Sequence, residues 1–363
     1  AAAERHSISR LWKQSSGLMA RSVTQNAGDH GEHYITRDKK EYWAMFYSAA
    51  GGGVLIALMA LFKTYLGSII DDKVWKGIAE GLNYGLGFMV IFMLHFTVAT
   101  KQPAMTAARF AEAVEKTPQG KTVNMKLAQL LVDVFRSQSI AVLGNVLIAM
   151  GLAALIAFSY QYKTGEPLMN ADQIAYQLHS IDPFAGTLWF AAIAGVWLFC
   201  SGIISGYFDN RSNYLNMRMR LAQHPLLKKL MSEKTRVKFA NYMHENYGSL
   251  IGNFCFGMLL GLTGLVGYLT HLPLDIRHVA FSSANLGYSA VSGQFAYPFF
   301  LQCIAFVLLI GLVNLMVSFS LTLWVALRSL NTEIDSWWAI WHEVCQIVKK
   351  RPLSLFLPVQ LDK

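Results

Sequence analysis

Acidic residues are absent from the long apolar stretches of this sequence. Six such stretches, none containing Asp or Glu, lie near residues 44–66, 82–100, 139–160, 186–207, 249–270 and 299–327. Each is long enough to cross a bilayer as a helix, which takes roughly 20 residues. Ion-coupled transporters commonly place a carboxylate within their membrane helices. The sequence offers no such carboxylate in these stretches.

Cysteine and the common catalytic motifs are also scarce. The four cysteines include no C-x-x-C pair, so neither a disulfide framework nor a thiolate metal site is indicated. The chain contains no Walker A sequence, no G-x-S-x-G elbow and no H-E-x-x-H pair. We therefore expect no cofactor and favour a non-enzymatic role.

Hydrophobic residues and a patterned basic charge are abundant. Hydrophobic residues make up 54% of the chain and charged residues 15%, against roughly 25% charged in an average soluble domain. The segments before, between and after the six stretches carry seven, two, six, one, eight, one and five Lys or Arg residues in order. By the positive-inside rule, this alternation predicts a multi-pass protein of the bacterial inner membrane with both termini in the cytoplasm.

The fold class expected is an all-α polytopic membrane bundle of about six spans, because barrel strands would alternate in hydropathy and be shorter. We predict a cytosolic lead-in over 1–43, a transmembrane domain over 44–328, and an amphipathic cytosolic helix and tail over 329–363. A weakly apolar segment at 278–292 is too short to span and predicts a re-entrant element.

Aromatic and small residues predict two kinds of contact. In the tail, Trp337 and Trp341 suit an interfacial helix, and packing against the protein's own cytosolic loops is the equal alternative. The gap at 208–248 predicts short helices on the membrane surface. Small residues four apart predict close helix packing at Gly81, Gly85, Gly202, Gly206, Gly257 and Gly261.

Polar residues within the stretches are the candidate ligand or pathway residues. His95 lies inside the second stretch, with Lys101 at its end, and the two could receive an anionic group. A neutral histidine between helices and a lysine that reaches the phosphates is the structural alternative. Amides in the stretches either hold helices together or line a pathway if they meet, and they are Asn145, Asn253, Gln302 and Asn314.

A metal site is not expected. In the lead-in, His30 and His33 could ligate a first-row metal, but two histidines three residues apart on a polar segment form a pattern of low specificity. A polar loop that happens to be rich in histidine explains them equally.

Four segments carry a resemblance to a known family. They are LNYGLGFMVIFMLHFTVATKQPAMTAARFA at 82–111, GSLIGNFCFGMLLGLTGLVGYLTHLPLDIRHVAFSSANLG at 248–287, GEHYITRD at 31–38 and SGYFDN at 205–210. The chain resembles the bacterial gonococcal-type site-specific recombinases, a polytopic inner-membrane family. The resemblance implies that this chain corresponds to the membrane-embedded C-terminal part of longer members.

The family's label implies DNA recombination, yet the residues for that chemistry are missing. A tyrosine recombinase needs an H-x-x-R element, and none of the ten histidines has Arg three residues on. We therefore expect a non-enzymatic scaffold or a protein that handles a lipid or other amphiphile. A transporter or channel with a polar pathway is the alternative, and the recombinase of the label ranks third.

The partners expected from the sequence follow from its basic segments. These segments favour anionic lipid headgroups at the cytosolic face, with a protein partner complex as a further possibility. Nucleic acid is not expected as a partner.

Overall fold

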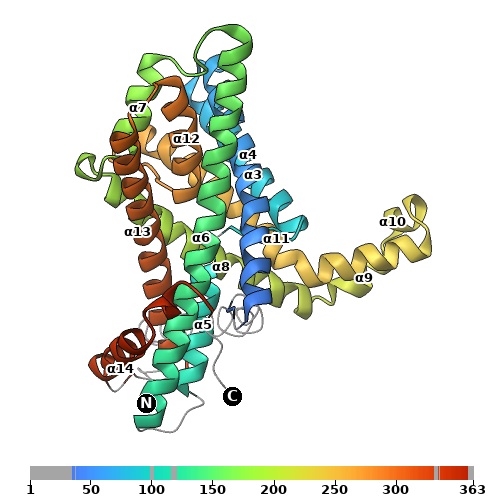
Figure 1. Cartoon of the computed structure of the whole chain (residues 1–363). Helices are drawn as coiled ribbons and strands as arrows, with labels where there is room; N and C mark the ends of the chain where they lie inside the picture. The colour runs from blue at the N-terminus through green and yellow to red at the C-terminus, as the bar shows by residue number, and fades with distance from the viewer. Residues whose placement is uncertain are drawn as a thin grey trace, which may run out of the picture.

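Helices make up the ordered structure of this chain. The structure, a computed structural model, describes residues 35, 36, 38–98, 102–115, 121–330, 334 and 336–358, and no strand occurs among them. The helices, labelled as in Figure 1, are α3 Lys39–Ile69, α4 Lys73–Met93, α5 Gln102–Glu115, α6 Lys121–Thr164, α7 Ala171–Ile181, η3 Pro183–Ala185, α8 Thr187–Tyr214, α9 Met217–Gln223, α10 Pro225–Leu230, α11 Glu233–Thr270, α12 Val279–Ser292, α13 Tyr297–Ser329, α14 Trp337–Lys350 and η4 Pro352–Leu355.

Five of the described helices are long and apolar enough to cross a membrane. They are α3, residues 124–164 of α6, α8, α11 and α13. The all-α polytopic class expected from the sequence is therefore confirmed. The second predicted stretch, 82–100, corresponds to α4, which is not among the five. Its 21 residues still extend about 32 Å at 1.5 Å per residue, close to the hydrocarbon thickness of a bilayer.

Two helix boundaries add detail to the sequence-based expectation. Helix α6 begins at Lys121, before the predicted stretch 139–160, and continues to Thr164 without a break. The tail helix predicted within 329–363 begins at Trp337, where the Ser336 hydroxyl caps it by accepting a hydrogen bond from the Ala339 amide at 3.2 Å.

Close contact between α4 and α11 depends on paired glycines. Gly257 of α11 lies against the backbone of Gly85, and Gly261 lies against Gly81, so that a Cβ on either α11 residue would overlap the backbone of α4. Small residues allow backbones to approach in this way without a hydrophobic driving force. On α8 the residues that meet α11 include Ser201 and Ser205. The glycines predicted there are half-buried at Gly202 and buried at Gly206.

The segment after α4 turns back across α3. The Thr97 amide donates to the Ser48 carbonyl at 3.1 Å, and the Ser48 hydroxyl donates to the His95 carbonyl at 3.0 Å. Gly52 leaves room for this crossing, because a Cβ there would meet the Thr97 carbonyl. The crossing therefore fixes the C-terminal end of α4 against α3.

Helix α12 is a re-entrant element inside the bundle. It is a helix of 14 residues, ten of them buried, that packs against α3, α6 and α13 and lies among them in Figure 1. The chain reaches its first turn through residues 271–278. His278 at this turn is buried among the rings of Phe88, Phe256 and Phe281, with centroids 5.8–6.2 Å apart. Phe88 follows the start of α4 at Lys73 by fifteen residues. The first turn of α12, which contacts Phe88 through His278, therefore lies about 22 Å along the bundle from the start of α4.

A hydrophobic cluster lies at the end of the bundle that carries α14. It joins α5, the first turns of α6, the last turns of α13 and α14, and includes Phe110, Val132, Leu323 and Ile340. Trp337 stacks on Phe110 at 6.3 Å but remains half-exposed, as does Trp341. One face of the tail helix therefore packs on the protein, as one of the two alternatives predicts, and its tryptophans remain at the surface; its interfacial role stays a prediction.

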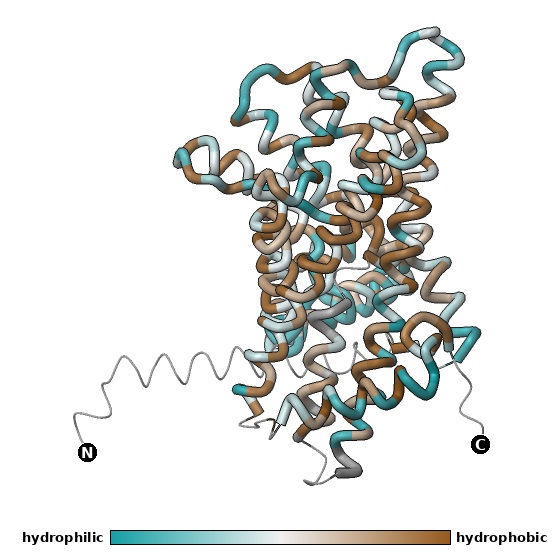
Figure 2. Tube along the Cα trace, turned by 60° about the vertical axis from the view of Figure 1, so that its left-hand side comes forward, coloured by the Kyte–Doolittle hydropathy of each residue, from teal (hydrophilic) through white to brown (hydrophobic). Residues whose placement is uncertain are grey.

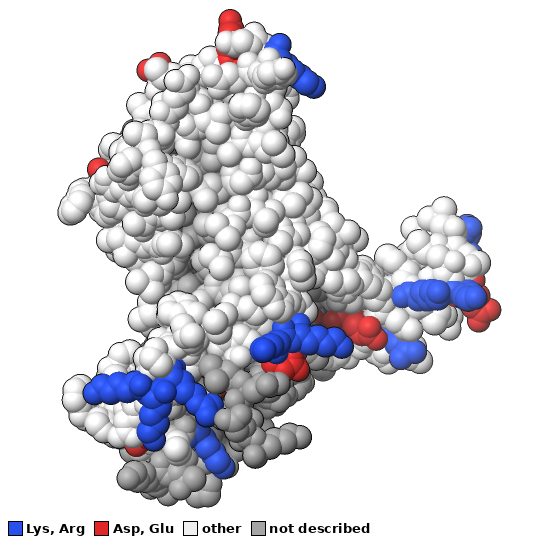
Figure 3. Space-filling view, viewed as in Figure 1, with Lys and Arg blue, Asp and Glu red and all other residues white. Residues whose placement is uncertain are grey.

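Charge and hydropathy divide the molecule into layers. In Figure 2 hydrophobic residues fill the middle of the bundle and hydrophilic ones gather toward its ends. On the face shown in Figure 3, Lys and Arg lie mainly at the end with α14 and on an arm at one side, and the middle of the bundle shows a wide region without charge. The start of α3 lies at that same end of the bundle.

Candidate functional site

The proposed site residues that the structure describes do not form one site. His95 is exposed in the turn after α4, with φ 58°, and does not lie within a span. Lys101, His30 and His33 lie outside the described residues. His95 was predicted to face a crevice from inside the second span together with Lys101. Because α4 ends at Met93, His95 does not lie inside that helix.

The intramembrane amides are separated from one another. Asn145 donates to the carbonyls of Ala49 and Thr97, which joins α6 to α3 and to the crossing segment. Asn253 donates within its own helix, and Gln302 is exposed. Asn145 and Asn253 therefore bond backbone carbonyls at different places, whereas Gln302 lies at the surface.

Asn314 is the amide with the richest set of partners. Its side chain donates to the Ala191 carbonyl at 2.8 Å and to the Arg277 carbonyl at 2.9 Å, and it accepts the Val279 amide at 3.1 Å. It is fully buried. Asn314 therefore ties the turn of the re-entrant element to both α8 and α13.

A partly buried ion pair joins α3 to α4. Lys63 Nζ lies 3.2 Å from Glu80 Oε2, with side-chain exposures of 37% and 13%. Lys63 precedes the end of α3 at Ile69 by six residues, and Glu80 follows the start of α4 at Lys73 by seven, which places the pair about 10 Å inside the bundle. Glu80 lies outside the predicted stretch 82–100, because α4 begins at Lys73, well before residue 82.

A second ion pair belongs to the segment that enters the bundle before α12. Arg277 Nη1 lies 2.5 Å from Asp275 Oδ2, and Arg277 Nε donates to the Ser180 carbonyl of α7 at 2.8 Å. The guanidinium also lies over the Phe190 ring at 5.3 Å. These contacts hold the entering segment against α7 and the start of α8.

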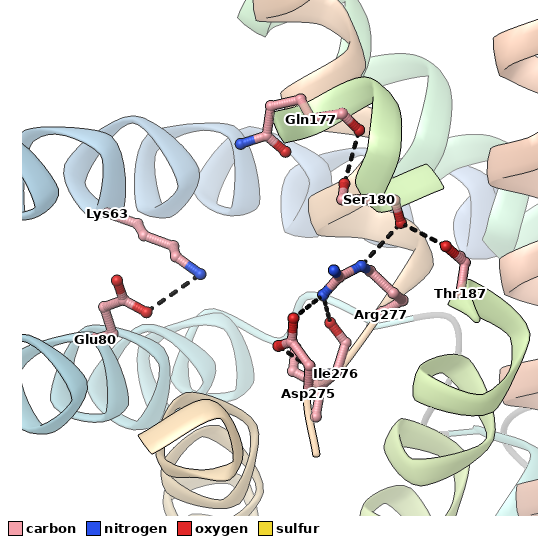
Figure 4. Close-up of polar contacts among 8 residues, drawn as sticks. All are labelled: Lys63, Glu80, Gln177, Ser180, Thr187, Asp275, Ile276 and Arg277. Carbon is pink, nitrogen blue, oxygen red and sulfur yellow. Dashed lines mark hydrogen bonds and ion pairs between the residues drawn. The ribbon is translucent and has the colours of Figure 1, made fainter. Parts of the chain in front are cut away.

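The two ion pairs lie near each other, because Lys63 interacts electrostatically with both Glu80 and Asp275. Figure 4 shows Lys63 and Glu80 on one side and Asp275 and Arg277 on the other. The groups that interact electrostatically with Lys63 include Glu80, Tyr176 and Asp275. The Lys63 ammonium also lies 5.6 Å from the centre of the buried Tyr84 ring. We call Lys63, Glu80, Asp275 and Arg277 the charged cluster.

The charged cluster can bind a polar group but has no evident catalytic arrangement. It offers two cations and two carboxylates beside aromatic rings, which suits a charged or zwitterionic headgroup. Across the described ranges, no three His, Cys, Asp or Glu side chains converge as metal ligands would. One sequence signal could have indicated the site: Lys63 is the single Lys or Arg inside the apolar stretches.

The family comparison agrees with the resemblance carried by the four segments. A family model described as "Site-specific recombinase" matches residues 1–358, nearly the whole sequence. The chain belongs to this site-specific recombinase family. No curated protein and no solved structure matches it. The membership gives the family, and the structure gives the apolar helical fold.

Proposed function

We propose that this member of the site-specific recombinase family is a non-enzymatic membrane protein that binds a lipid or another amphiphile by its polar headgroup. The observation that carries the proposal is the Lys63–Glu80 pair, which lies about 10 Å inside the bundle while 37% of the Lys63 side chain remains accessible. Ionisable groups at such depth are costly and mark functional positions more often than not. Lipid tails would follow the apolar helix surfaces below the headgroup.

The surroundings of Lys63 support a headgroup site rather than a purely structural pair. Burying an ion pair seldom adds net stability over apolar residues of similar volume. Here a second pair, Asp275 with Arg277, lies across from Lys63 in Figure 4, and the exposed Tyr176 lies near Lys63. A zwitterionic headgroup could therefore meet a cation and a carboxylate at once.

The orientation proposed from the sequence places this site in the outer half of the membrane. The basic residues gather at the end with α14, opposite the end near the charged cluster, and the positive-inside rule assigns that basic end to the cytoplasm. We accordingly propose a bacterial inner-membrane protein with both termini cytosolic. Its ligand would then enter from the outer leaflet or from the periplasm.

Mass spectrometry of the protein in native lipid discs tests the proposal. We expect a stoichiometric, enriched amphiphile with the wild type and its loss in the double variant Lys63→Glu/Glu80→Lys, which keeps an ion pair but exchanges its two ends. Retention of the same amphiphile by the double variant would contradict this site. A stoichiometric protein partner without an enriched amphiphile would favour a scaffold instead.

Transport is the second candidate, and the re-entrant α12 favours it. Short helices that end at membrane depth line substrate sites in several transporter folds, and α12 begins about 22 Å inside the bundle. A Ser282→Cys variant without other cysteines distinguishes the two functions. Labelling of this buried position from each side in turn by an impermeant thiol reagent would indicate a transport pathway, whereas a binding protein leaves it unlabelled from at least one side.

A further inference from the structure

A lateral arm leaves the side of the helix bundle. It consists of α9, α10 and residues 233–247 of α11, and it projects away from the other helices in Figure 1. Its helices pack mainly on one another and on the end of α8. Most of its surface is therefore not covered by the rest of the protein.

The arm leaves the bundle at the level expected for a membrane surface. Gly248, where the arm meets the bundle, precedes the end of α11 at Thr270 by 22 residues, or about 33 Å of helix. This length matches the hydrocarbon core of a bilayer, about 30 Å. The Gly248 amide donates to Asp209 of α8 at 2.8 Å, and Ser212 bonds His244 Nδ1 at 3.1 Å. These contacts fix the base of the arm to α8.

The exposed side chains of the arm are of two kinds. Large apolar side chains point outward, with Leu230 78% exposed. The others of this kind are Met219, Leu226 and Val237. Between residues 217 and 238 the chain has seven basic residues and a single carboxylate, Glu233. The basic residues are Arg218, Arg220, Lys228, Lys229, Lys234, Arg236 and Lys238.

We propose that the arm lies in the headgroup layer of a leaflet that contains anionic lipid. Its apolar side chains enter the boundary of the acyl chains, and its basic side chains pair with lipid phosphates. Charge complementarity selects anionic lipid over a second copy of the chain, because two such arms would bring like charges together. This inference does not depend on the charged cluster or on its proposed ligand.

Hydrogen exchange of the full chain, in lipid discs that each hold one copy, tests whether the arm lies in the headgroup layer. Discs of phosphatidylcholine alone are compared with discs in which part of the lipid is phosphatidylglycerol. We expect slower exchange of arm peptides in the anionic discs. Replacing basic residues, as in Lys228→Gln/Lys229→Gln, should weaken this protection about fivefold for each residue removed at low salt. The matched control, Lys349→Gln/Lys350→Gln on α14, should leave the arm unchanged.

Two results would overturn the proposal. One is equal exchange of the arm in both kinds of disc. The other is protection that arises only when discs hold two copies, because it would assign the arm to contact between copies of the chain.

Discussion

Replacing Asn314 should release the re-entrant element from its neighbours. The side chain holds three backbone groups, which are the carbonyls of Ala191 and Arg277 and the amide of Val279. Asn314→Leu keeps a similar volume but leaves all three groups without this partner. The hydrophobic packing around the position is otherwise retained.

The expected cost follows from the number of hydrogen bonds lost. Side-chain hydrogen bonds in membrane proteins average about 0.6 kcal/mol and reach about 1.7. Three bonds therefore predict a loss of about 2–5 kcal/mol in the free energy of unfolding. Asn253→Leu is the matched control, because that amide bonds only a carbonyl of its own helix at 2.8 Å, and it should cost about 1 kcal/mol or less.

Reversible unfolding in mixed micelles by a denaturing detergent measures both variants. Hydrogen exchange of residues 279–292 should also rise more in Asn314→Leu than in Asn253→Leu. Equal losses in the two variants, or unchanged exchange of α12 in Asn314→Leu, would refute the role given to Asn314.

Three further predictions concern other contacts. Lys63→Met should lower the free energy of unfolding more than the double variant Lys63→Met/Glu80→Gln does, since the single change leaves a carboxylate unpaired; a double-mutant cycle with additive losses would contradict the ion pair. Gly257→Val should cost at least 1–3 kcal/mol by forcing α4 from α11, measured against Gly151→Val, where a Cβ meets no atom within 4 Å; similar yields of folded protein would contradict the contact. Arg136→Met should speed hydrogen exchange near Thr36 and near Ser354, because its guanidinium donates to the Thr36 carbonyl at 2.6 Å and lies 3.4 Å from the Ser354 carbonyl; unchanged exchange at both places would contradict this.

The sequence predicts the helices of this fold better than their ends. Long apolar runs indicated the spans, because burial in lipid requires both length and hydropathy. The start of α4 was missed, since Lys73, Lys76 and Glu80 lower the hydropathy of its first turns. Lys73 lies over the Tyr268 ring of α11 and Glu80 pairs with Lys63 of α3, and a window of hydropathy does not reveal such partners.

Pairing between helices was only partly predictable. Glycines four apart indicated close packing, but only the structure shows that Gly81 and Gly85 lie opposite Gly261 and Gly257. The same limit applies to the site. Lys63 was visible inside an apolar stretch, whereas its partner Glu80 lies on another helix and outside the predicted span. Contacts between distant parts of the chain depend on helix rotation and register, which one sequence does not specify.

Photo-crosslinking from a residue beside the charged cluster tests most directly whether Lys63 and Glu80 form a headgroup site. Benzoylphenylalanine is placed at the exposed Tyr176, which interacts with Lys63, and separately at the exposed Tyr162 near the end of α6 as control. After irradiation in native lipid discs, intact-mass analysis should show one discrete amphiphile attached at 176 and only mixed bulk lipid at 162. The same mixed bulk lipid at both positions would contradict a headgroup site at Lys63 and Glu80.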